Sequence, residues 1–219
     1  SLPTMLLLRY GDPKWVEYNL QSAKTIREKF MGVTERGSLN FYSTEFGMEG
    51  INRNAGGGGD TGYHARALKH HIWLGWYGIP AAGDVFVQWC DGWREITMAE
   101  IGTKPSGFAP SSVFFPSGGI DPPMGMKWYD DRAHYYGFPG LSNMVFSSFI
   151  TAYLLSDDRG FLDVIQRMMT LATHGPLAGY DDTLPPDDIN NLLSRTAHWA
   201  DADLLSVYRL LADGGVYDE

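Results

Sequence analysis

The chain has 219 residues, enough to bury a core of its own as one domain. Hydrophobic residues make up 44% of it and charged residues 20%, which excludes the composition of a disordered protein. The net charge is −9 and no run of Lys or Arg appears, which argues against a surface for nucleic acid or for an anionic membrane, because both need clustered positive charge.

No stretch of about 20 apolar residues is present, so no membrane-spanning helix is expected. No basic segment followed by an apolar one opens the chain as a secretion signal would, although Ser1 begins almost inside an apolar segment and an upstream leader could have been removed. The single cysteine, Cys90, excludes an intrachain disulfide and lies among apolar residues, where we expect a buried thiol.

The first helices are predicted over residues 5 to 30, with a break near Gly11. Gly11 can end one helix, Asp12 can cap the next, and Pro13 suits the first position of that next helix. From Trp15 onward the apolar residues follow helical spacing. The segment is therefore predicted to be a helical hairpin.

The same order of helix, turn and helix recurs further along the chain. We expect helices over residues 64 to 101 with a break at 78 to 83, over 141 to 173 with a break at 157 to 160, and over 188 to 212. Stacked helical hairpins tolerate loops of different lengths between repeats. The predicted fold class is all-α: helical hairpins with long loops in a single domain over residues 1 to 219, which could be a fragment of a larger protein.

The ends of this predicted array look incomplete. The first hairpin lacks most of its leading helix, and the last one stops where its second helix should begin. Terminal repeats normally carry polar caps, and residues 5 to 8 have none. We therefore expect self-association or docking onto the rest of a longer parent chain.

Two long loops interrupt the predicted helices, over residues 32 to 62 and 102 to 140. The first loop contains residues 41 to 46, which could form a short strand, and four consecutive glycines that end at Gly59. Loops of this length inside a compact domain are often binding or lid segments. Both are expected at the same end of their hairpins, as walls of one cleft.

Several of these features resemble the (α/α) toroid six-hairpin superfamily of glycosidases and polysaccharide lyases. They are the turns at residues 11 to 15 and 157 to 161, the pair Trp89 and Trp93, and the long aromatic loops. Asp60-Thr61-Gly62-Tyr63 is similar to the His-Asp-x-Gly-Phe segment of toroid hydrolases that act on unsaturated uronides, with Gly59 in place of the His. The resemblance implies about half a toroid, carbohydrate-active as a lyase or a hydrolase, and secreted or periplasmic.

The residues after the glycine run carry the first candidate chemistry. Asp60, Tyr63, His64 and Arg66 would place an acid or base, a phenol, an imidazole and a guanidinium around one helix start, as general acid–base catalysis in a cleft requires. The alternative is that Asp60 only caps the N-terminus of that helix.

A polar trio and a cluster over residues 130 to 136, which has the same residue types, are further candidates. Asn52, Arg53 and Asn54 form a polar trio; in the lyases that the chain resembles, such a group neutralises a sugar carboxylate while a Tyr or His removes the proton at C5. The alternative is that this trio belongs to a solvated loop. The second cluster consists of Arg132, His134 and Tyr135. Its alternative is a salt bridge at a helix start with packing aromatics.

Trp89 and Trp93 are four residues apart and share a helix face, either as core packing between hairpins or as a platform for a sugar ring. No His-Glu-x-x-His spacing, phosphate loop or nucleophile elbow is present, so we predict no metal and no cofactor.

The predicted catalytic residues are Asp60, Tyr63, His64 and His134, and the predicted substrate-binding residues are Asn52, Arg53, Arg66, Arg132, Tyr135 and Trp89. The expected ligand is an acidic or neutral saccharide, with no nucleic acid or membrane as partner. Elimination by a Tyr or His and hydrolysis by a carboxylate such as Asp60 both stay open. A non-catalytic helical-repeat scaffold that binds glycan or protein is the alternative. An enzyme needs the groups from Asn52 to Arg66 and those from Asp130 to Tyr136 in one pocket. In a scaffold these two clusters would lie apart.

Overall fold

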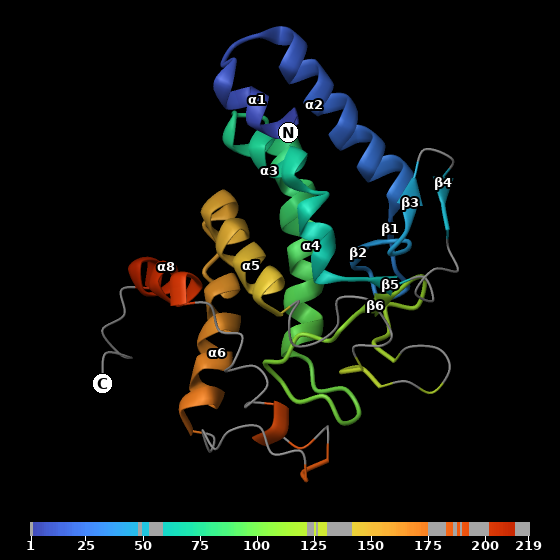
Figure 1. Ribbon diagram of the computed structural model, residues 1–219, viewed down its shortest axis with the longest axis vertical. Coiled ribbons are helices and arrows are strands. Elements are labelled where there is room, and N and C mark those ends of the chain that lie inside the picture. Colours follow the sequence, from blue (N-terminus) through green and yellow to red (C-terminus); the bar gives the residue numbers. More distant parts are fainter. Residues whose placement is uncertain are drawn as a thin grey trace.

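The computed structural model describes residues 2–47, 50–52, 59–121, 125, 127–130, 142–174, 183–185, 188, 190–192 and 202–212. Helices dominate these residues (Figure 1). The hairpin of α1 (Leu2–Leu8) and α2 (Pro13–Thr25) lies at one end of the long axis, α4 (Pro80–Met98) runs through the middle, and α6 (Gly160–His174) lies toward the other end.

The first hairpin consists of α1 (Leu2–Leu8) and α2 (Pro13–Thr25), and a π-helical turn (Ile26–Phe30) extends α2. The predicted break at Gly11 is confirmed: this glycine has a φ of 81°, which favours glycine because it has no Cβ. The Asp12 carboxylate accepts a hydrogen bond from the Lys14 amide at 3.0 Å and caps α2.

The second hairpin consists of α3 (Lys69–Trp76) and α4 (Pro80–Met98). The break between them is at residues 77 to 79, so the predicted break over 78 to 83 is right in place but extends too far, into the first turn of α4. Gly75 and Gly83 let the two helices approach closely, because a Cβ added at Gly75 would lie 2.9 Å from the Gly83 Cα. No side chain larger than hydrogen fits between the two backbones at that point.

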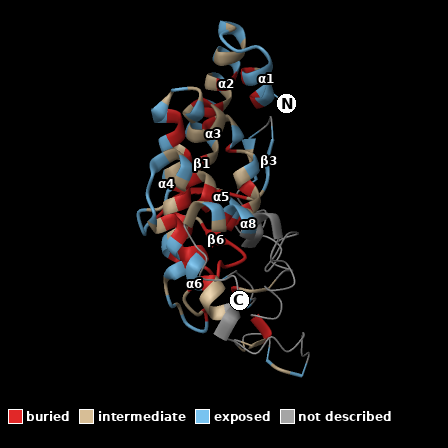
Figure 2. Ribbon diagram, turned by 90° about the vertical axis from the view of Figure 1, so that its left-hand side faces the viewer, coloured by how far each residue is buried: buried red, intermediate tan, exposed pale blue. Residues whose placement is uncertain are grey.

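The core is centred on the buried face of α4, whose large residues follow helical spacing: Phe86, Trp89, Cys90 and Trp93. This face packs against α5 (Ser142–Ser156), and buried residues concentrate along both helices (Figure 2). The Cys90 Sγ lies 3.7 Å from the carbonyl oxygen of Ser148 in α5, and the thiol is fully buried, as predicted.

The C-terminal helices are α6 (Gly160–His174) and α8 (Ala202–Ala212), and α5 and α6 form a third hairpin. The predicted break between α5 and α6 is confirmed: Asp157 has a φ of 59°, and the Asp158 carboxylate accepts a hydrogen bond from the Gly160 amide at 2.9 Å. Of the helix predicted over residues 188 to 212, the structure has α8 at residues 202 to 212. Most of the residues before α8 lie outside those that the structure describes.

The prediction of an all-α fold is wrong, because the described chain also contains three two-stranded antiparallel sheets. They pair β1 (Met31–Val33) with β2 (Leu39–Phe41), β3 (Phe46–Gly47) with β4 (Gly50–Ile51), and β5 (Gly59–Asp60) with β6 (Val113–Phe114). Strands of two or three residues are too short to produce an alternating pattern, so most of them could not be predicted from the sequence. The fold is mixed, with helices around small sheets.

The two long loops meet, as the sequence predicted. The β5–β6 ladder joins them, the Glu35 amide donates to the Pro116 carbonyl at 2.8 Å, and the rings of Tyr42 and Phe115 are in edge contact at 4.6 Å. These contacts position the segment around Asp60.

Part of the α1 surface remains apolar and exposed, including Leu8, which is 70% exposed. Self-association through this surface stays a prediction, which light scattering at micromolar concentration would check. Among the described residues, no helix combines the length and the apolar character needed to cross a bilayer.

Lys104, in the loop that follows α4, caps the C-terminal end of that helix. Its Nζ donates to the carbonyls of Thr97, Ala99 and Pro105 at 2.8, 2.7 and 3.0 Å, and the residue is 1% exposed. Burial lowers the pKa of Lys104 to about 7.

We expect the free energy of unfolding to rise with pH from 7 to 8.5 because of Lys104. Its folded-state pKa is lowered, so in this window the unfolded chain binds the proton that the folded chain has lost, which favours folding as pH rises. The largest slope for one proton is about 1.4 kcal/mol per pH unit. Urea titrations at several pH values give this slope for wild type and for Lys104→Met, and the difference between the two slopes is the contribution of Lys104. Equal slopes in the two proteins would contradict the prediction.

Candidate active site

Asp60 is the centre of the candidate site and is fully buried. It ends β5, where Asp60 pairs with Val113 of β6, and it directly precedes the 3-10 helix η3 (Gly62–Arg66). Residues from both long loops therefore fix its backbone. Thr61, not Asp60, is the N-cap residue of η3, so the expected alternative of Asp60 as the helix cap is wrong.

Four groups converge on the Asp60 carboxylate. Oδ2 accepts hydrogen bonds from Asn40 Nδ2 at 2.8 Å, from the Phe41 amide at 3.2 Å and from Trp89 Nε1 at 2.7 Å. Oδ1 lies 2.6 Å from His64 Nδ1. Because these contacts occupy both oxygens and the residue is buried, Asp60 positions other groups and has no surface for a substrate.

His64 is the partner through which Asp60 can act on a ligand. Its ring is 4% exposed and stacks on Phe41, with 4.3 Å between the centroids and 20° between the planes. Within the described part of the chain, its hydrogen bonds all use Nδ1, from Asp60 on one side and the Thr61 amide on the other. Nε2 is the nitrogen left for proton transfer.

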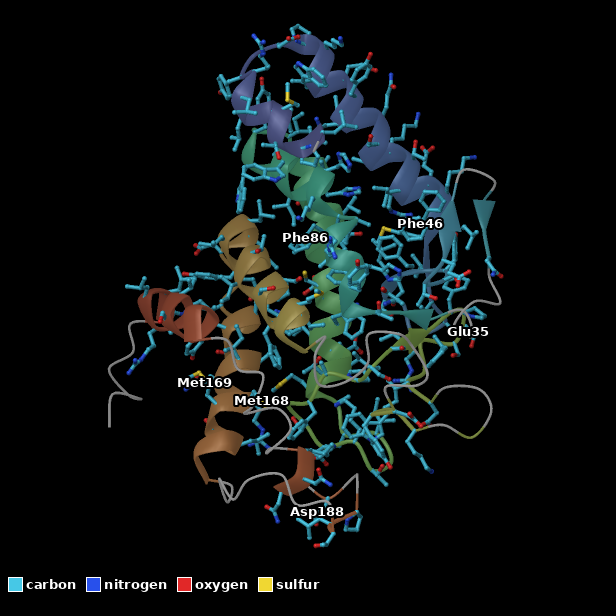
Figure 3. All side chains as sticks on the ribbon, in the orientation of Figure 1. Glu35, Phe46, Phe86, Met168, Met169 and Asp188 are labelled. Carbon is cyan, nitrogen blue, oxygen red and sulfur yellow. The ribbon has the colours of Figure 1, made fainter. Side chains whose placement is uncertain are left out.

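A pocket of about 470 Å³ lies at the β3–β4 turn, close to this histidine. The described residues that line it are Thr44, Glu45, Phe46, Gly47, Gly50 and Asn52. Phe46 joins the pocket to the dyad, since its ring centroid is 5.9 Å from that of His64. Figure 3 places Phe46 beside the end of α2, where its ring stacks on Phe30 at 4.7 Å.

Asn52 is the one described member of the predicted polar trio, and it does line the pocket. Its Nδ2 donates to Glu45 Oε2 at 3.1 Å, and its backbone carbonyl accepts from Ser43 Oγ. The pair of Asn52 and Glu45 gives the pocket both amide and carboxylate groups.

Tyr63 and Arg66 form a separate pair on the outer side of η3. Arg66 Nη1 donates to the Tyr63 hydroxyl at 2.6 Å, and the guanidinium lies over the Tyr63 ring at 4.8 Å. Arg66 is exposed and neither residue is among those that line the pocket. These two predicted site residues thus contact each other within η3.

Trp89 is fully buried in α4, and its ring contacts Phe86 and Trp93 with centroids 6.0 and 5.9 Å away. It has no exposed face on which a sugar ring could stack. Packing in the core, with its indole N–H donated to Asp60, accounts for this residue.

Four predicted site residues lie outside the described residues: Arg53, Arg132, His134 and Tyr135. The structure therefore does not test whether the second cluster shares a pocket with His64.

Two other histidines are placed elsewhere, between α2 and α3. His70 Nδ1 lies 2.8 Å from Asn19 Oδ1, and burial lowers the pKa of His71 to about 4, which keeps that ring neutral.

The sequence prediction missed Asn40, Glu45 and Phe46. Asn40 lies between Leu39 and Phe41 in β2 and is fully buried. A polar residue between two apolar ones is also what an exposed strand position looks like, so the sequence offered no signal for its burial.

No family model matches this chain, and no curated protein or solved structure is significantly similar to it. Function is therefore argued from the site itself.

Proposed function

We propose that this chain binds a saccharide in the β3–β4 pocket and that His64 transfers a proton to or from it through Nε2. The observation that carries the proposal is the buried pair of Asp60 and His64, at 2.6 Å, beside a pocket that opens to solvent. A carboxylate that orients an imidazole while the far nitrogen stays available is the arrangement that general acid–base catalysis requires.

The lining of the pocket supports a saccharide as the ligand. Phe46 is 37% exposed and supplies apolar surface in the pocket, against which the C–H groups of a sugar ring can pack. Thr44, Glu45 and Asn52 add hydroxyl, carboxylate and amide groups at the rim, which can bind sugar hydroxyls. Aromatic and polar groups in one pocket suit a ligand that has both kinds of surface.

The burial of Asp60 argues against hydrolysis in which that carboxylate acts directly on the glycosidic bond. Hydrolysis by two carboxylates requires both of them to face the sugar, and Asp60 is fully buried with both oxygens occupied. We therefore assign the proton transfer to His64 and give Asp60 the role of holding the ring.

We expect His64→Gln to lower the rate of saccharide cleavage by about 10²- to 10⁴-fold, because general acid–base groups contribute factors of this size. The purified chain is incubated with neutral and uronic-acid oligosaccharides. New 4,5-unsaturated ends are followed by ultraviolet absorbance and reducing ends by colour. Elimination raises both signals, whereas hydrolysis raises only the second.

His70→Gln is the matched control, because His70 is a half-buried histidine on α3 whose Nδ1 contacts Asn19 Oδ1 and not a carboxylate. It should leave the rate unchanged. The proposal fails if the unmutated chain yields neither signal. If that chain still binds the sugars, and His64→Gln binds them equally well, a glycan-binding scaffold takes the place of the enzyme.

A further inference from the structure

The two contacts at His64 Nδ1 compete with each other, because a ring nitrogen either carries a hydrogen or offers a single lone pair. The Thr61 amide lies 3.1 Å from Nδ1 and would need a bare nitrogen as its acceptor. Asp60 Oδ1 lies 2.6 Å from the same atom, so a proton must lie between the carboxyl oxygen and Nδ1. Either Asp60 carries that proton and Nδ1 is bare, or Asp60 is ionised and Nδ1 carries it.

The other side of Asp60 decides between these two states. Oδ2 accepts three N–H donors, from Asn40, Phe41 and Trp89, and all three stabilise the carboxylate anion. These three donors outweigh the single Thr61 amide, which a protonated Nδ1 leaves without an acceptor there, so we place the proton on His64 Nδ1.

Asn40 is the donor whose orientation is fixed from further away. Its Oδ1 accepts a hydrogen bond from Ser38 Oγ at 2.7 Å, which leaves Nδ2 to point at Asp60. Since the Ser38 hydrogen is used in this bond, the Thr34 hydroxyl must be the donor in its 2.7 Å contact with Ser38. The donors thus run in one direction from Thr34 through Ser38 and Asn40 to Asp60, and such chains strengthen each bond in them.

The surroundings of this relay keep it in place. Thr34, Asn40 and Asp60 are buried, and Ser38 packs against Gly92 of α4. A Cβ added at Gly92 would lie 2.8 Å from the Ser38 Cβ, so only glycine lets α4 approach the hairpin this closely.

We propose that Asn40, oriented by Ser38 and Thr34, is a positioning residue that fixes His64 in the tautomer with Nδ1 protonated and Nε2 bare. His64 then meets a ligand as a proton acceptor, so the first step at this site is proton removal from an acidic O–H or C–H group of the substrate. This inference rests on the proposed function for its substrate, but its tautomer assignment stands on the hydrogen bonds alone.

The tautomer is measured without any substrate. Long-range ¹H–¹⁵N correlation on histidine-labelled protein, at a pH where the ring is neutral, reports which nitrogen carries hydrogen. We expect Nδ1 of His64 to give the protonated signal and Nε2 the bare one. Asp60→Asn should reverse the two signals, because the amide can donate to Nδ1 and would leave the hydrogen on Nε2.

Asn40→Leu should shift the His64 Nδ1 signal toward the bare position, because it removes one of the three N–H donors to Asp60 Oδ2. Asn19→Leu is the matched control: Asn19 is equally buried and bonds His70, so this change should move the His70 signals and leave those of His64 in place. Ser38→Ala, at a half-buried position, should act in the same direction as Asn40→Leu with a smaller shift, and serves if Asn40→Leu does not fold.

A bare Nδ1 in the unmutated protein overturns the inference, as does a folded Asn40→Leu with unchanged His64 signals. Failure of the proposed function looks different. In that case the tautomer would be as expected, but no saccharide would be bound or cleaved.

Discussion

Asp60→Ala is expected to lower the free energy of unfolding by about 3–5 kcal/mol, because removing one partner of a buried charged network leaves the others without a bond. Four donors around Asp60, from β2, η3 and α4, would lose their acceptor in a place that water does not reach. Urea unfolding followed by tryptophan fluorescence measures the change.

Asp60→Asn separates charge from shape in the same experiment. Its amide oxygen can still accept from the three donors at Oδ2 and its amide nitrogen can donate to His64, so we expect a smaller loss of about 1–3 kcal/mol. Asp84→Asn, on the exposed side of α4, is the control and should stay within about 0.5 kcal/mol of wild type. Equal stability of Asp60→Ala and wild type would remove the basis for Asp60 as the centre of the site.

Trp89→Ala is expected to cost about 3–5 kcal/mol, since it opens a cavity in the core and removes the indole N–H donor to Asp60. Trp89→Phe keeps much of the packing and removes only the donor, so its cost should be about 1–3 kcal/mol. Thermal unfolding of both variants measures the two contributions separately.

Trp76→Ala is the matched control for this pair. Trp76 ends α3, is 49% exposed, and has one edge contact with Trp73 at 5.3 Å, so its loss should cost much less than that of Trp89. A coupling between Trp89→Phe and Asp60→Asn is also expected, because the two residues share a hydrogen bond. Additive effects of these two changes would show that the 2.7 Å contact contributes little to stability.

The helix breaks could be predicted from the sequence because local chemistry determines them. Gly11 and Asp12 act within a few residues of their own positions, and so do Asp157 and Asp158. The small sheets could not be predicted in this way. Gly59 and Phe114 pair across more than fifty residues, and nothing in either short segment identifies its partner.

The candidate site was predicted in part. Asp60 and His64 are four residues apart, so a contact between them could be expected from the sequence, and their role in a site stays a proposal. The role of Asp60 could not be inferred, because its other side-chain donors, Asn40 and Trp89, lie 20 and 29 residues away in the chain. Asp60 was expected to act as an acid or base, but elements distant in the sequence bury it, so we assign it the role of orienting His64.

The position of Cys90 makes the core of this protein open to direct measurement. It is the only cysteine in the sequence, and its sulfur is buried between α4 and α5. Burial also raises the pKa of the thiol, so the folded chain holds it in the form that reacts slowly. The rate at which a thiol reagent labels the native protein therefore reports how often these two helices separate, without any introduced probe.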